Sequence, residues 1–252
     1  KARTFLASEL ATIGFEPAGP DGSYEQIMEL VGVTTSAPAA WRFDRQGSSV
    51  ELARGADFIA ASGLQAVSAG VENAEVVFAG YGIVAPEYDW NDFKDVDVRG
   101  KVLIVLNNDP DWDPALFDGV TRLYYGRWMY KYESAARQGA AGVIIVHTTP
   151  SAGYGWNVVQ SSWSGPQYEL PAGDEPRSDV EAWVTEDAAR RLLGPAHDLD
   201  ALVAQARSRE FKPVSLGITT SLALTNTLSR TPTANVLGVL RGSDPALTDQ
   251  HI

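Results

Sequence analysis

Three histidines are the side chains of this sequence best suited to bind zinc or to act as a general base near neutral pH. They are His147, His197 and His251, and the sequence has no cysteine. A zinc site needs three or four ligands converging on one point, and a local pair has i, i+4 spacing on a helix or i, i+2 spacing on a strand. The three histidines lie far apart in different predicted elements, so we expect no metal site from them. Without cysteine, thiolate catalysis, cysteine-zinc sites and disulfides are also excluded.

An acidic run at 109–113, DPDWD, has the spacing with which a calcium-binding loop begins. An EF-hand loop also needs Gly at its sixth position and Glu at its twelfth. Pro114 and Val120 stand at these positions, so the run is interpreted as a solvated acidic loop.

The spacing of Gly80, Gly82 and Ala85 after a predicted strand matches a dinucleotide-binding motif, G-x-G-x-x-A. That motif works only when a helix begins there and its N-terminus holds the pyrophosphate. Pro86 follows instead, and 87–93 shows no helical periodicity, so we reject a nucleotide site. The sequence also lacks a G-x-S-x-G elbow and a P-loop.

Aromatic side chains are the strongest remaining signal. They gather at a loop–helix junction, 124–130, and in a Gly/Ser-rich segment, 151–165. Aromatic groups on loops favour a binding surface, because leaving them uncovered is costly. The candidate substrate-binding residues are Tyr125, Arg127, Tyr154, Trp156 and Trp163. Packing within a core is the alternative, mainly for Trp128 and Tyr132, and for the loop residues both interpretations remain open.

Two continuous apolar runs must position these loops. The runs at 102–106 and 142–147 are typical of buried strands, and the spacing over 127–138 predicts a helix that Gly139 ends. Trp128, Tyr132 and Ala135 are expected on its inner face. A strand, a helix and a second strand predict a β-α-β unit with parallel strands.

The other predicted elements make the fold class α+β. Helices are expected at 3–13, ended by Gly14, after the N-cap Thr185, and at 199–208. Strands are expected at 24–33, 74–83, 216–230 and 235–240; short strands between 34 and 75 complete the set.

Composition narrows the function classes further. The 20 basic and 32 acidic residues of the 252-residue chain give a net charge of −12, which disfavours nucleic acid and anionic membrane as partners. No apolar run approaches the ~20 residues of a membrane span. The absence of cysteine fits a secreted or periplasmic protein that avoids oxidation.

Several long stretches resemble the protease-associated domain of the di-zinc exopeptidases, the aminopeptidase and glutamate-carboxypeptidase group. They are VFAGYGIVAPEYDWNDF at 77–93, DVRGKVLIVLNNDP at 97–110, YYGRWMYKYESAARQGAAGVIIVHTT at 124–149 and SAGYGWNVVQSSWSG at 151–165. RTFLASELATIGFEPAG at 3–19 resembles the helix before the catalytic core of that family, and NVLGVLRGSDPAL at 235–247 resembles the strand that opens it.

The resemblance implies a lid inserted into a catalytic domain. Residues 34–211 would form the lid over the active site, shaping substrate access and peptide recognition, while 1–33 and 212–252 would belong to the catalytic domain. Two zinc ions are implied for the parent enzyme. The family's ligands and general base have no counterpart here, and His251 aligns before the first ligand, so this chain is expected to hold no catalytic residue, metal ligand or cofactor. A non-enzymatic interaction module is the alternative.

The expected partners follow from this interpretation. They are a peptide substrate and the catalytic domain that the chain lacks. Unpaired edges and an uncovered apolar face on the terminal strands also predict self-association.

Overall fold

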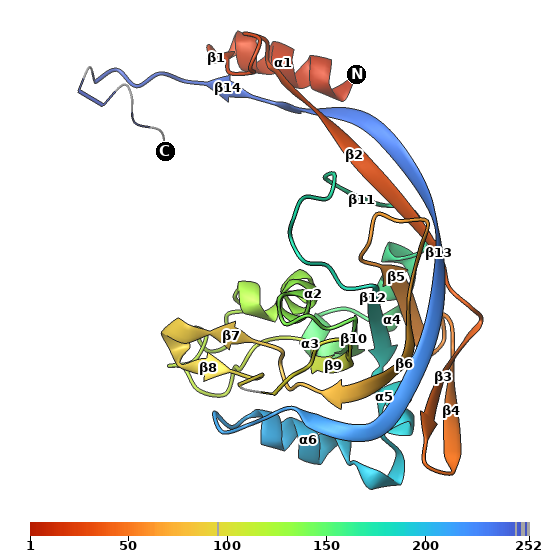
Figure 1. Ribbon diagram of the computed structural model, residues 1–252. Helices are drawn as coiled ribbons and strands as arrows, with labels where there is room; N and C mark the ends of the chain where they lie inside the picture. Colours follow the sequence, from red (N-terminus) through yellow and green to blue (C-terminus); the bar gives the residue numbers. More distant parts are fainter. Residues whose placement is uncertain (95, 245, 248–249, 251–252) are drawn as a thin grey trace. The chain divides into compact units, whose positions relative to one another are not determined.

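The computed structural model describes residues 1–94, 96–244, 246–247 and 250. The chain divides into two compact units (Figure 1). Unit 1 comprises Lys1–Gly32, Tyr168–Pro171 and Ser229–Ile252, and unit 2 comprises Val33–Gln167 and Ala172–Leu228. Two long strands, β2 (Glu25–Ser36) and β13 (Val214–Val236), contribute residues to both units. His251, which the sequence places before a metal ligand, lies outside the described residues.

Unit 1 has little interior of its own. It contains helix α1 (Ala2–Thr12) and the antiparallel pair of short strands β1 (Glu16–Pro17) and β14 (Gly238–Val239). Gly14, with φ 92°, lies just beyond α1, as the sequence predicts. Among the described residues of this unit, only Val31 and Gly32 are buried.

Unit 2 is built on four parallel strands. In sheet order they are β6 (Ser68–Phe78), β9 (Val102–Leu106), β10 (Gly142–His147) and β12 (Val180–Thr185). Antiparallel strands extend both sides of this set. On one side β5 (Phe58–Ser62) pairs with β12, and on the other β13 pairs with β6 and also with β3 (Ala40–Arg45), which pairs with β4 (Ser48–Ala53).

Strands β9 and β10 are buried on both faces, so their alternate side chains enter two separate cores. Leu103, Val105 and Val143 pack into one core with residues of α2 (Trp128–Arg137). Ile104 and Ile144 pack into the other core, which α5 (Glu186–Leu193) and α6 (Leu199–Ala206) complete. Figure 1 shows α2 on one side of these strands and α5 and α6 on the other.

Short elements complete the fold. They are β7 (Val84–Ala85), β8 (Trp90–Asn91), α3 (Thr149–Ala152), α4 (Trp156–Ser162), β11 (Gln167–Glu169) and the 3-10 turns Pro86–Tyr88, Tyr124–Gly126 and Gly194–Ala196. No helix in the described part of the chain is both long and apolar enough to cross a membrane.

The structure confirms the mixed α+β class and the β-α-β unit. Strands β9 and β10 are parallel and have the predicted bounds, because continuous apolar runs between turn residues define buried strands clearly. The helix between them also lies within its predicted range.

Four predicted elements are wrong in detail. The strand expected at 74–83 is β6 and ends at Phe78, because Gly80 and Gly82 adopt φ values of 60° and 64° that break the extended run. The segment at 151–165 is largely helical rather than a loop. The strand expected at 216–230 continues to Val236 as β13, so the strand expected at 235–240 is not a single element and only Gly238–Val239 forms β14.

Candidate functional site

Buried polar residues of unit 2 gather where the parallel strands β9 and β10 end. Asn107 and Asp109 follow β9, and His147 is the last residue of β10. All three are buried. The carboxyl edge of parallel strands is where α/β proteins most often bind ligands, so this edge is the first place to look for a binding site.

Helix α2 adds a buried lysine to this edge. Lys131 is fully buried, and its Nζ donates to the carbonyl oxygens of Tyr81 at 2.8 Å and Asn108 at 2.7 Å. Sequence reasoning missed this residue. The signal was its position four residues before Ala135 on the inner face, where a charged residue is unusual.

Tyr125 and Arg127 differ in how available their side chains are to a ligand. The hydroxyl of Tyr125 donates to Glu87, and its ring packs edge-on against Phe117 at 5.4 Å and Tyr130 at 5.0 Å. The hydrogen bond to Glu87, followed by burial, raises the pKa of Tyr125 to about 12, so the phenol keeps its proton. Arg127 is exposed.

Tyr154 and Trp156 surround His147. The ring centroids lie 5.9 Å and 5.5 Å from that of His147, whose Nε2 is 3.0 Å from the carbonyl oxygen of Tyr154. The indole Nε1 of Trp156 donates to the carbonyl oxygen of Gly55 at 2.7 Å. Both aromatic side chains are partly buried against the core beneath α2, so structural contacts already engage them.

Trp163 belongs to a third aromatic group. Its ring lies 5.7 Å from Trp128 and 5.9 Å from Tyr132, both edge-on. Tyr132 and Ala135 are buried as expected, but the predicted inward position of Trp128 is wrong, since 39% of this residue is exposed. Trp128 is the first residue of α2, where a side chain can extend past the end of the core.

The five candidate residues therefore do not form one cluster. Among the described residues, no ring contact joins Tyr125 to the His147 group or either of them to the Trp163 group. The accessible part of these groups is the start of α2, where Arg127, Trp128 and Met129 are exposed. We call these three residues the α2 surface.

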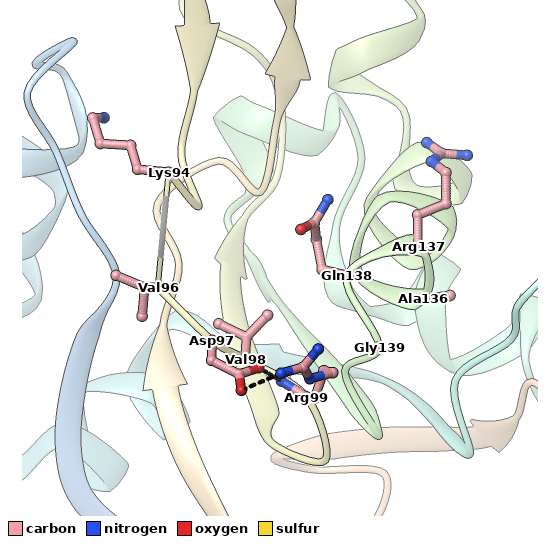
Figure 2. Close-up of a pocket in the computed structure, with 9 residues that line it drawn as sticks. All are labelled: Lys94, Val96, Asp97, Val98, Arg99, Ala136, Arg137, Gln138 and Gly139. Atoms are coloured by element: carbon pink, nitrogen blue, oxygen red, sulfur yellow. Dashed lines mark hydrogen bonds and ion pairs between the residues drawn. The ribbon is translucent and has the colours of Figure 1, made fainter.

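A pocket of about 460 Å³ lies near the other end of α2 (Figure 2). Its lining includes the cationic residues Lys94, Arg99 and Arg137. Each cation already has a partner: Lys94 donates to the carbonyl oxygen of Asn91 at 3.0 Å, Arg99 pairs with Asp97 at 2.8 Å, and Arg137 lies 3.7 Å from Glu133. The donor groups of all three cations are therefore already engaged by the protein.

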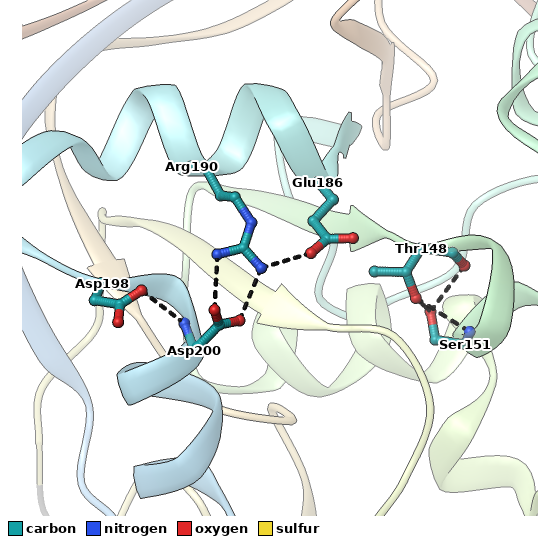
Figure 3. Close-up of polar contacts among 6 residues, drawn as sticks. All are labelled: Thr148, Ser151, Glu186, Arg190, Asp198 and Asp200. Atoms are coloured by element: carbon teal, nitrogen blue, oxygen red, sulfur yellow. Dashed lines mark hydrogen bonds and ion pairs between the residues drawn. The ribbon is translucent and has the colours of Figure 1, made fainter.

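Two polar groups near the parallel strands are structural (Figure 3). Arg190 bridges Glu186 and Asp200, each at 2.7 Å. Ser151 Oγ donates to the carbonyl oxygen of Thr148 at 3.1 Å and accepts from Thr148 Oγ1 at 2.8 Å. A nucleophilic serine would instead need a hydrogen bond to a general base, so Ser151 serves as part of a helix cap.

The described residues also offer no zinc site. They contain no group of three or more His, Asp or Glu side chains that could hold a metal ion. The resemblance implies two zinc ions for the parent enzyme, and the side chains that the structure describes include no group that would hold them.

Comparisons with known proteins give two solved structures of interest. No protein-family model matches the sequence, and no curated protein matches it. An aminopeptidase from Aneurinibacillus sp. strain AM-1 is 17% identical with a TM-score of 0.36, over 97% of this chain and 43% of that one. A zinc aminopeptidase from Bacillus subtilis is 14% identical with a TM-score of 0.29, over 96% and 41%. The chain thus spans less than half the length of each.

Proposed function

We propose that this chain is the N-terminal and lid portion of a zinc-dependent, aminopeptidase-like exopeptidase. In this proposal, 34–211 form a protease-associated lid that shapes substrate access. Residues 1–32 and 229–252 of unit 1 then belong with a catalytic domain that supplies both zinc ions, whereas 212–228, which the resemblance also gave to that domain, pack within unit 2. Export from the cytoplasm is part of the proposal, because a chain without cysteine tolerates an oxidising compartment.

The observation that carries the proposal is the contrast between the two units. Unit 2 has two cores of buried residues, whereas the described part of unit 1 buries only Val31 and Gly32. Phe5, Leu6 and Ile13 on and just after α1 are 62%, 49% and 64% exposed. A unit without a core does not stabilise itself, so unit 1 needs further protein to cover it. A well-packed module between two such segments has the chain order of an inserted lid.

Peptide recognition is assigned to the α2 surface together with Trp163. Arg127 offers an exposed guanidinium for a carboxylate, and the ring of Trp128 is partly exposed beside Trp163. Tyr125, Tyr154 and Trp156 are left out of this surface, because the hydroxyl of Tyr125 and the indole of Trp156 already have protein partners and the ring of Tyr154 packs beside His147.

The test uses the full-length protein that contains this chain. We expect it to bind zinc and to release N-terminal residues from aminoacyl p-nitroanilides and short peptides. Arg127→Gln should raise KM several-fold with little change in Tm, because its side chain is exposed. Trp128→Ala should also raise KM several-fold. Arg54→Gln, which changes an exposed arginine of unit 2 outside α2, is the control.

The alternative, a non-enzymatic interaction module, predicts a different outcome. A full-length protein that neither binds zinc nor hydrolyses any N-terminal residue would rule out the peptidase proposal. If Arg127→Gln then weakened binding to a peptide partner, the interaction module would be favoured. For the chain by itself, we expect no stoichiometric zinc after dialysis against a weak chelator, measured by elemental analysis.

A further inference from the structure

Lys131 joins three segments of unit 2 that are distant in sequence. It lies on α2, and its Nζ donates to the carbonyl oxygen of Tyr81, in the turn after β6, and to that of Asn108, in the segment after β9. The residue is fully buried. A buried ammonium persists only where hydrogen bonds and opposite charges offset its lost hydration.

Two buried carboxylates supply the opposite charge. Asp92 accepts from the backbone N of Ile83 at 2.9 Å and from Trp90 Nε1 at 3.0 Å. Asp109 accepts from the backbone N of Leu123 at 3.0 Å. Burial raises the pKa of Asp92 and lowers that of Lys131, and the attraction between the two charges opposes both shifts.

Arg122 joins the end of the segment 107–123 to its beginning. Its Nε donates to Oδ1 of Asn108 at 2.7 Å, and its Nη2 donates to the carbonyl oxygen of Ser151. The bonds of Asn108 and Asp109 therefore tie the start of the segment 107–123 to its end at Arg122 and Leu123. Lys131, through its bond to Asn108, in turn connects these two joined ends of the segment to α2.

The segment 107–123 needs such a restraint. Asn108, Phe117 and Asp118 have φ values of 83°, 47° and 62°, a backbone region that residues other than glycine adopt at a cost. Phe117 is nevertheless fully buried, with its ring 4.5 Å from that of Tyr88. A strained backbone persists only where surrounding contacts hold it in place. The main polar contacts that hold this segment are those of Asn108, Asp109, Arg122 and Lys131.

We propose that the ammonium of Lys131 holds the segment 107–123 against α2, and that the segment opens when this ammonium is removed. We call this set of contacts the latch. The latch does not depend on the enzymatic role proposed above. It concerns how this part of the fold is held, and it can be tested on the chain itself.

The test is hydrogen exchange of the whole chain with Lys131→Ala. We expect peptides covering 107–123 to exchange at least tenfold faster, while peptides covering β10 keep their protection. The missing group is propylammonium, so n-propylammonium chloride should restore protection. Tetramethylammonium, which has the same charge but no donor, should not restore it. Lys101→Ala is the matched control, because this lysine pairs with Glu75 at 2.8 Å outside the latch and should leave 107–123 unchanged.

Two milder variants keep the proposal testable if Lys131→Ala does not fold. Arg122→Gln and Asp109→Asn each remove one of the charges that join the two ends of the segment. Each should speed hydrogen exchange of 107–123 several-fold and leave the cores intact. Unchanged exchange in folded Lys131→Ala, or in both milder variants, would overturn the latch. Opening that n-propylammonium fails to reverse would overturn the role of the cation.

Discussion

His147 shows at the scale of one residue how burial decides chemistry. It ends β10 and is 4% exposed, with the rings of Trp156 and Trp183 at 5.5 Å and 6.1 Å. Burial lowers the pKa of His147, and its hydrogen bond to Tyr154 opposes this shift. The imidazole is therefore held neutral near pH 7, and its buried ring packs against Trp156 and Trp183.

Because the folded pKa of His147 lies below its unfolded value, the stability of the fold depends on pH. The unfolded chain takes up a proton below about pH 6.5 that the folded chain resists. Stability is thus fully present above that pH and is lost as the pH falls through the window down to the folded pKa. This residue contributes a slope of at most about 1.4 kcal/mol per pH unit.

The measurement is the free energy of unfolding by denaturant between pH 5 and pH 7. His147→Gln should flatten the pH dependence relative to the unchanged chain. His197→Gln is the control, since this half-buried ring only approaches the carbonyl oxygen of Leu216 at 3.3 Å. Equal slopes in the parent chain and His147→Gln would show that His147 is not the group responsible.

At the scale of the element, the turn after β6 depends on glycine. Gly80 has φ 60°, and a Cβ there would lie 2.8 Å from Cε1 of Phe211. Gly217 has φ 64° and lies at a bulge in β13, with open space where a Cβ would point. The two positions share backbone strain but differ in packing.

We therefore expect Gly80→Ala to cost more stability than Gly217→Ala. The shared left-handed conformation costs about 1–2 kcal/mol, and overpacking against Phe211 adds about 1–3 kcal/mol at position 80 only. Chemical denaturation of both variants measures the difference. Similar losses at both positions would mean that Phe211 moves aside freely.

The start of α5 gives a second prediction at this scale. Thr185 is the N-cap, as the sequence predicts, and its side chain accepts from the backbone N of Ala188 at 3.1 Å. Thr185→Ala should cost about 0.5–2 kcal/mol of unfolding free energy. Thr121→Ala, at an exposed threonine outside helices, should change stability by less than ~0.5 kcal/mol. A loss no larger than that of the control would show that the cap adds nothing.

At the scale of the whole molecule, the two units differ in the source of their stability. Unit 2 buries strands β9 and β10 on both faces, whereas α1 has no buried residue. Helices this short are marginal in water without packing. In the proposal above, the stability of unit 1 comes from contacts with further protein.

Hydrogen exchange of the chain in dilute solution should show this contrast. We expect 102–106 and 143–146 to be protected by orders of magnitude more than α1 and 236–240. We also expect the chain to self-associate through the terminal strands, which would bury their exposed apolar side chains, or to leave these strands frayed. Light scattering gives the mass in the same buffer. A monomer with α1 and 236–240 strongly protected would contradict the proposal that unit 1 lacks a partner.

Local signals determined several elements of this protein from the sequence alone. The apolar runs at 102–106 and 142–147, the helix between them and the cap at Thr185 all match the structure. Each depends on neighbouring residues only, such as an unbroken apolar run or a cap side chain that reaches the next turn. The mixed α+β class follows from these elements.

Tertiary structure decided which side chains remain available. The sequence could not show that Trp156 reaches Gly55, about one hundred positions away, or that Lys131 binds the carbonyl oxygens of Tyr81 and Asn108. Such contacts depend on how distant segments meet, and no spacing encodes that. For the same reason, aromatic residues that look alike in sequence divide into a buried Tyr132 and a partly exposed Trp128. The sequence identified the region that carries the candidate surface, and long-range packing selected the residues that present it.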